Sequence, residues 1–152
     1  MSGRRAPPIR VVCLGSGYVA AYLSYGLRRQ IRRGVVDLTV VGRDNFHTFH
    51  GFIPEMLVGR IQPGQIITPM RRMVDPARFH NAEIQSIDLS RHEVLTTRLL
   101  DGREYPIHYD HLVLALGSRD DPSRYPGPAE HALLLRSYWD ALKTRNHIID
   151  ML

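Results

Sequence analysis

The sequence has 152 residues, of which 43% are hydrophobic and 23% are charged; this composition is typical of a globular domain and excludes disordered and collagen-like chains. The net charge is +5, but arginines spread along the chain carry almost all of the positive charge, so nucleic-acid binding is not predicted. Cys13 is the single cysteine, which excludes an internal disulfide and a dithiol redox site, and the longest apolar runs are far shorter than the roughly 20 residues that span a bilayer.

The N-terminal third predicts a strand, a helix and a second strand. Residues 1–8 carry basic side chains without the apolar segment of a secretory signal, so we expect a disordered leader and a cytoplasmic protein. The β-branched, apolar run 9–14 predicts a strand buried on both faces of a sheet. Apolar positions then recur every four residues, as on the buried side of a helix, at Val19, Leu23, Leu27 and Ile31. Gly34 is predicted to end this helix, and a strand over 35–41 completes a unit whose two strands are parallel.

The turn between the first strand and the helix carries the pattern G-x-G-x-x-A, which is typical of dinucleotide-binding sites. In this pattern Gly15 permits the tight turn, Gly17 lets a pyrophosphate approach the backbone, and Ala20 lets the helix pack close to the strand. The free amides and the positive end of the helix dipole would bind the phosphates. The predicted cofactor-binding residues of this turn are Gly15, Ser16, Gly17, Tyr18, Val19 and Ala20.

The end of the second strand leaves the identity of the dinucleotide open. In sites of this type an acidic residue about 20 residues after the glycines accepts hydrogen bonds from a ribose. Gly42 occupies that place here, and Gly42 followed by Arg43 favours a 2′-phosphate and therefore an NADP-binding reductase domain. Asp44, two residues further on, is an alternative partner for the ribose. Gly42, Arg43 and Asp44 are all candidate cofactor-binding residues.

Short elements are predicted over the rest of the chain. A short helix is expected around 54–58, and Thr68 followed by Pro69 predicts the start of another, with Met70, Met73 and Val74 packed inward. Polar breaks separate three segments that predict an antiparallel meander, 82–89, 93–99 and 104–108.

Two further elements follow the meander. The apolar run 111–116 predicts another buried strand, which a proline-rich loop follows. Ser137, with Asp140 three residues later, predicts the N-terminal cap of a last helix. Trp139 and Leu142 have helical spacing and are expected in the core.

The segment Tyr109–Ser118, with the sequence YDHLVLALGS, resembles the strand that contacts FAD in the two-dinucleotide-binding flavoproteins of the pyridine nucleotide-disulfide oxidoreductase superfamily. Within that superfamily the sequence is most similar to the type II NADH dehydrogenases, over nearly the whole chain from Arg10 to His147. Further similar segments are 44–49, 61–66, 83–89, 126–127 and 145–147. The single cysteine argues against the related sulfide:quinone enzymes, which need additional reactive cysteines.

This resemblance implies an α/β fold, namely a Rossmann-like three-layer FAD-binding domain with a parallel sheet and an antiparallel β-meander. It implies that the glycine-rich turn binds the FAD pyrophosphate and that the backbone of Glu83 and Ile84 lies at the adenine. It also implies that Ala115, Leu116 and Gly117 close over the cofactor. In such an enzyme a hydride passes from NADH to FAD and electrons pass on to a quinone. Because the flavin carries this chemistry, no catalytic residue is named.

The resemblance covers the N-terminal part of such enzymes, so the FAD domain is expected to be incomplete at its C-terminus. We interpret residues 9–136 as the N-terminal part of this domain and residues 137–152 as a helix leading toward an absent nicotinamide-binding domain. A missing half-domain or a partner chain would complete the enzyme, peripheral membrane association would depend on the absent parts, and this chain alone would be inactive.

Two alternatives remain open: an NADP-binding reductase domain and a non-enzymatic dinucleotide-binding remnant. The first is favoured by Gly42 and Arg43, and the second by the missing nicotinamide domain. No metal site is predicted, because His47 and His50 lack a third ligand of matching type nearby.

Overall fold

A computed structural model describes residues 6–118 and 120–152 and divides the chain into two compact units. The first unit comprises the described residues up to His47 together with Pro69–Gly117. The second comprises Thr48–Thr68 and the described residues from Ser118 to Leu152. The expected leader falls partly outside the described residues, and residues 6–8 have no regular secondary structure.

The first unit is built on a six-stranded sheet with the strand order β7-β6-β5-β2-β1-β8. Its strands are β1 (Ile9–Leu14), β2 (Val36–Gly42), β5 (Arg78–Asp88), β6 (Glu93–Arg98), β7 (Glu104–His108) and β8 (His111–Leu114). β1 pairs in parallel with β2 and β8, and β2 pairs in parallel with β5, whereas β5, β6 and β7 pair antiparallel. The predicted parallel sheet and antiparallel meander are therefore confirmed. β5 begins at Arg78 and not at Ala82, because residues 78–81 pair with β2.

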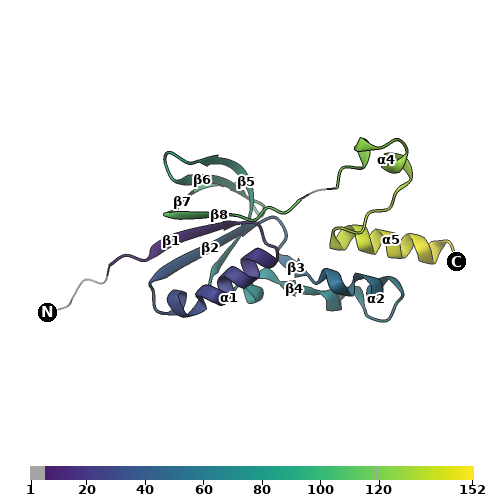
Figure 1. Cartoon of the computed structure of the whole chain (residues 1–152), viewed down its shortest axis with the longest axis horizontal. Coiled ribbons are helices and arrows are strands. Elements are labelled where there is room, and N and C mark those ends of the chain that lie inside the picture. The colour runs from purple at the N-terminus through teal and green to yellow at the C-terminus, as the bar shows by residue number, and fades with distance from the viewer. Residues whose placement is uncertain (1–5, 119) are drawn as a thin grey trace. The chain divides into compact units, whose positions relative to one another are not determined.

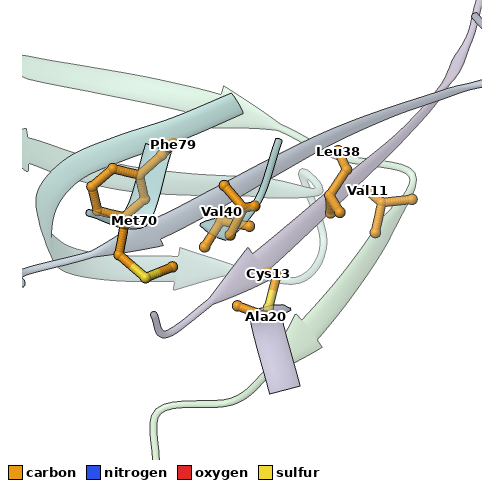
Figure 2. Packing of buried hydrophobic residues seen from close by; sticks show 8 residues of the cluster. Val11, Cys13, Ala20, Leu38, Val40, Met70 and Phe79 are labelled. Atoms are coloured by element: carbon orange, nitrogen blue, oxygen red, sulfur yellow. The ribbon is translucent and has the colours of Figure 1, made fainter. Parts of the chain in front are cut away.

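Alternation along β1 explains how both faces of the parallel strands are covered. Val11 and Cys13 point into one hydrophobic cluster, which includes Ala20 of helix α1 (Tyr18–Arg32). Val12 and Leu14 point into another cluster, to which strands of the meander contribute. Helix α1 and the meander thus lie on opposite faces of the parallel strands (Figure 1), and Figure 2 shows Cys13 directed at Ala20. This arrangement makes the three layers that the sequence predicts.

Helix α1 differs from the prediction in the face that it buries. Val19 was predicted to point inward, but it is 52% exposed, whereas Ala20 is fully buried. The reason is geometric: a strict spacing of four residues drifts around a helix with 3.6 residues per turn. The face that contacts the sheet consists of Ala20, Leu23, Leu27 and Ile31. Gly34 follows the helix with a φ of +68°, as a left-handed C-terminal cap requires.

The predicted helix after Thr68 is shorter than expected and starts later. Thr68 lies in strand β4 (Ile67–Pro69), which pairs with β3 (Phe46–Thr48), and Pro69 caps the four-residue helix α3 (Met70–Met73). A proline has no N–H to donate, so it fits a strand end or a helix start equally well. Here residues 67–69 form a strand because they pair with β3. The inward packing of this segment is confirmed, because Met70 and Val74 are fully buried.

An ion pair ties the start of β1 to the start of β8. The Arg10 guanidinium donates from Nη2 to Oδ1 of Asp110 at 2.7 Å and from Nε to Oδ2 at 3.2 Å. The Arg10 backbone N–H also donates to Oδ2, at 2.7 Å, and the Asp110 N–H donates to the Arg10 carbonyl at 2.8 Å. These bonds hold β8 in register beside β1, and so position the residues that follow each strand.

This pair predicts a pH dependence of stability. The hydrogen bonds from Arg10 lower the pKa of Asp110 from 3.8 to about 2. A carboxyl with a lowered folded-state pKa stabilises the protein above its unfolded pKa, and this contribution is lost as the pH falls through the folded pKa. We therefore expect Asp110→Asn to flatten the decline in unfolding free energy between pH 3.8 and about 2. Urea titrations of the wild-type and Asp110→Asn chains over this pH range measure the effect. Equal slopes of unfolding free energy against pH in the two chains would contradict it.

The second unit consists of short helices around a small core of its own. Its helical elements are η1 (His50–Phe52), α2 (Ile53–Leu57), η2 (Pro63–Ile66), η3 (Pro122–Arg124), α4 (Pro128–His131) and α5 (Tyr138–Asp150). The buried residues Ile53, Met56, Ile66 and Ala141 pack α5 against α2 and η2. No helix within the described ranges has both the length and the apolar character needed to cross a bilayer.

The start of α5 confirms the predicted cap. The Ser137 hydroxyl accepts from the Asp140 N–H at 3.0 Å, and the Asp140 carboxylate accepts from the Ser137 N–H at 3.0 Å. Trp139 was wrongly expected in the core: it is 60% exposed, because α5 turns the side that carries Ala141 toward α2, and Trp139 lies on another side of the helix.

Candidate dinucleotide-binding site

The carboxyl ends of β1, β2 and β8 meet at one edge of the sheet, because the three strands are parallel and in register. Leu14 lies opposite both Val41 and Leu114. Beyond this point the Gly15 N–H donates to the Val41 carbonyl, and the Ala115 N–H donates to the Leu14 carbonyl, both at 2.8 Å. The turn after β1 therefore begins between the ends of its two neighbours, at the edge where open parallel sheets bind ligands.

Gly15 is required by the close approach of two backbone segments. Its φ is +118°, a conformation that L side chains rarely adopt. A Cβ at this position would lie 2.0 Å from the carbonyl oxygen of Ala115 and 3.2 Å from the nitrogen of Leu116. The first glycine of the motif therefore serves the packing of the β1 turn against the end of β8.

Gly17 differs from Gly15, because it is required neither by its backbone conformation nor by packing. Its φ is −93°, and apart from its chain neighbours none of the described residues comes within 4 Å of a Cβ built on it. Gly17 is the N-cap of α1, and within the described chain its helix amides receive no side-chain cap. The first turn of α1 has no acidic residue either, as expected of a helix N-terminus that binds an anion.

Gly42 makes room for the same turn. A Cβ at Gly42 would lie 2.5 Å from both Cβ and Oγ of Ser16, so a side chain here would collide with the turn after β1. The absence of a carboxylate at the end of β2 therefore has a steric cause. Gly15, Ser16, Gly42 and Ala115 thus form one packed group at this edge of the sheet.

An ion pair lies beside this group. Nη1 of Arg43 is 3.4 Å from Oε1 of Glu83, and the two side chains are 59% and 45% exposed. The Asn81 side-chain amide donates to the carbonyls of Gly42, at 3.2 Å, and of Arg43, at 2.6 Å, and so fixes the backbone from which Arg43 extends. No local pattern in the sequence predicts this role of Asn81. Its position opposite Gly42 comes from the register of β5 on β2, which only the paired strands reveal.

The remaining predicted residues lie at the start of α1, on β5 and in the segments after β2 and β8. The Tyr18 ring meets the His47 ring edge to face at a centroid distance of 4.5 Å, which fixes the first residue of α1. Ile84 packs its side chain against the buried cluster around Val41 and leaves its backbone in β5. Asp44 lies exposed beyond β2. Beyond β8, the Leu116 side chain is exposed and Gly117 has a φ of +72°.

Cys13 is the last residue but one of β1 and lies in the core. The side chain is fully buried, and Sγ is 3.9 Å from the Gly15 carbonyl oxygen. Burial raises the pKa of the thiol to about 11, so it stays protonated at neutral pH. This confirms the prediction that Cys13 acts as a small hydrophobic residue.

The donors that this edge of the sheet offers to an anion are backbone amides at a helix N-terminus. The charged side chains that the sequence analysis predicts here are Arg43 and Asp44 after β2 and Glu83 on β5. No group of three or more His, Cys, Asp or Glu side chains that could hold a metal ion occurs within residues 6–118 and 120–152.

Residues 9–149 match the sequence profile of the family described as pyridine nucleotide-disulphide oxidoreductase. Over an alignment of 154 positions, the chain is 32% identical to the external alternative NAD(P)H-ubiquinone oxidoreductase B4, mitochondrial, of Arabidopsis thaliana. It is 25% identical over 143 residues to the type II NADH:quinone oxidoreductase of Staphylococcus haemolyticus. These alignments cover 94% and 93% of this chain but only 26% and 34% of the two relatives, so the chain spans about a quarter to a third of their length.

Solved structures show the same fold. NDH2 from Plasmodium falciparum in complex with NADH aligns with a TM-score of 0.77 at 18% identity, over 94% of this chain and 29% of that chain. The sulfide:quinone oxidoreductase of Aquifex aeolicus aligns with a TM-score of 0.73 at 23% identity, over 94% of this chain and 32% of that chain. The Rossmann-like α/β fold class is thereby confirmed.

Proposed function

Because the chain belongs to the pyridine nucleotide-disulphide oxidoreductase family, we propose that it is the FAD-binding portion of an NADH:quinone oxidoreductase-like flavoprotein. The observation that supports this most strongly is the contrast between Gly15, which packs against Ala115, and Gly17, which leaves space open at the start of α1. The first glycine shapes the turn, and the second leaves room for a pyrophosphate.

The residues at the edge of the sheet fit the ADP part of FAD. The pyrophosphate would be bound by the backbone from Gly15 to Ala20, the adenine would lie against the backbone of Glu83 and Ile84, and the backbone from Ala115 to Gly117 would close over the cofactor. When bound, FAD supplies the hydride and electron transfer, so the protein needs only to bind and orient it. NADH and a quinone are the proposed substrates of the whole protein, since the relatives are named for them.

A competition experiment tests which part of FAD this chain recognises. Bound FAD is followed by flavin fluorescence while ADP or FMN is added. We expect ADP to displace FAD and FMN to leave it bound at the same concentration, because the open amides and the β2 edge would contact the ADP part. Displacement by FMN and not by ADP would contradict the proposed site.

Substitution of Arg43 tests whether the site prefers FAD or NADP. An exposed ion pair contributes about 0–1 kcal/mol, so Arg43→Ala is expected to change the FAD dissociation constant by less than about fivefold. Titrations of the wild-type and Arg43→Ala chains with FAD and with NADPH measure this. Tight NADPH binding that depends on Arg43 would instead favour an NADP-binding reductase domain.

A further inference from the structure

Gly42, the last residue of β2, has no side chain that could accept hydrogen bonds from a ribose. Ser16 closes the space around it, since any Cβ would lie 2.5 Å from the Ser16 side chain. A carboxylate therefore cannot be introduced at the end of β2 without moving the turn. If this edge recognises a ribose, the acceptor has to come from a position other than Gly42.

Glu83 of β5 is the carboxylate that the structure holds at this edge. The register places Asn81 opposite Gly42, and Glu83 follows two residues later, on the same side of β5 as Asn81. Asn81 fixes the backbone carbonyls of Gly42 and Arg43, and Arg43 in turn reaches Glu83 at 3.4 Å. The Arg43 side chain thus links the Glu83 carboxylate to the end of β2. Asp44 is also near in sequence, but it lies exposed beyond the strand.

We propose that Glu83 accepts the hydrogen bonds of the adenosine ribose in place of a β2 carboxylate, and that this makes the site select a free 2′-hydroxyl over a 2′-phosphate. The inference rests on the proposed binding of a dinucleotide at the Gly15–Ala20 turn. A carboxylate accepts from hydroxyl groups, whereas it repels a phosphate. Glu83 also neutralises Arg43, whose guanidinium would otherwise attract a 2′-phosphate.

The test uses two ligands that differ only in the 2′-phosphate, namely ADP-ribose and 2′-phospho-ADP-ribose. Their dissociation constants are measured by calorimetry for the wild-type chain, Glu83→Gln and Asp44→Asn. Both variants lose one negative charge near the same edge, but only Glu83→Gln breaks the ion pair with Arg43. Thermal melts of each chain confirm that it is folded.

We expect the wild-type chain to prefer ADP-ribose and Glu83→Gln to reduce that preference by about tenfold, a factor that lies between those for two unit charges a few ångströms apart in bulk water and near a protein surface. Asp44→Asn tests the alternative ribose partner, and it should keep the preference within about twofold, because Glu83 and not Asp44 is the carboxylate paired with Arg43 in the described chain. In the double variant Arg43→Ala/Glu83→Gln, the gain in 2′-phospho-ADP-ribose binding should disappear.

An unchanged preference in Glu83→Gln, in a chain that still binds ADP-ribose, would overturn the role of Glu83 and leave the proposed dinucleotide site intact. A shift in Asp44→Asn as large as that in Glu83→Gln would overturn it as well. Failure of the wild-type chain to bind ADP-ribose, ADP and FAD would overturn the site and this inference together.

Discussion

Gly17→Val is expected to abolish FAD binding, with a rise in the dissociation constant of at least about 100-fold, because charge-assisted hydrogen bonds each contribute about 1.5–3 kcal/mol and the side chain would displace several. The valine would occupy the open space in front of the α1 amides, where a phosphate would approach. The fold should tolerate it, since none of the described residues beyond its chain neighbours lies within 4 Å of the Cβ position. Replacement of the N-cap glycine by valine should reduce the unfolding free energy by no more than about 1 kcal/mol.

The matched control is Gly26→Val. Gly26 lies exposed on the same helix, and its Cβ position is likewise clear of the other described residues. Fluorescence titrations with FAD and thermal melts should show that the Gly26 variant binds like the wild type, whereas the Gly17 variant folds but does not bind. If Gly17→Val bound FAD with wild-type affinity, the start of α1 would not be the phosphate site.

Gly15→Ala is expected to have the largest effect on stability, lowering the unfolding free energy by at least about 2 kcal/mol through backbone strain and collision together. The added Cβ would lie 2.0 Å from the Ala115 carbonyl oxygen, and the φ of +118° is unfavourable for any side chain. Relief would require the ends of β1 and β8 to move apart, which the Arg10–Asp110 pair at the other end of both strands opposes. Urea titrations and thermal melts measure the loss, at about 2–4 °C per kcal/mol for a chain of this size.

The variant Gly34→Ala separates the cost of backbone strain from the cost of the collision. Gly34 also has a positive φ, +68°, but within the described chain no atom beyond its neighbours comes near its Cβ position. Its substitution should therefore cost only the conformational strain, about 1–2 kcal/mol. Equal losses for the two variants would mean that the contact of Gly15 with Ala115 contributes nothing.

Local sequence patterns were sufficient to predict the elements that position the site. The apolar run before Gly15, the helical periodicity up to Ile31 and the left-handed Gly34 are each contained within a few neighbouring residues. The same holds for the capping box of Ser137 and Asp140, whose two hydrogen bonds lie within one helical turn. Such features follow from local geometry, so the structure confirms them.

Contacts between distant segments could not be predicted in the same way. The lack of an acidic residue at Gly42 is visible in the sequence, but its cause is a collision with Ser16, 26 positions earlier in the chain. Asn81 and the early start of β5 likewise depend on strand pairing, which gives Asn81 its place opposite Gly42. The exposure of Val19 and Trp139 depends on which side of a helix meets its neighbour, and hydrophobic spacing alone does not determine that.

Amide chemical shifts of the uniformly ¹⁵N-labelled 152-residue chain during titration with FAD test the central claim most directly. If the turn after β1 binds the pyrophosphate, the amides of Gly17, Tyr18 and Val19 should show the largest changes, which saturate with a single dissociation constant. The same amides should respond to ADP alone. Saturable FAD binding that leaves these three amides unchanged, or no binding at all, would contradict the account.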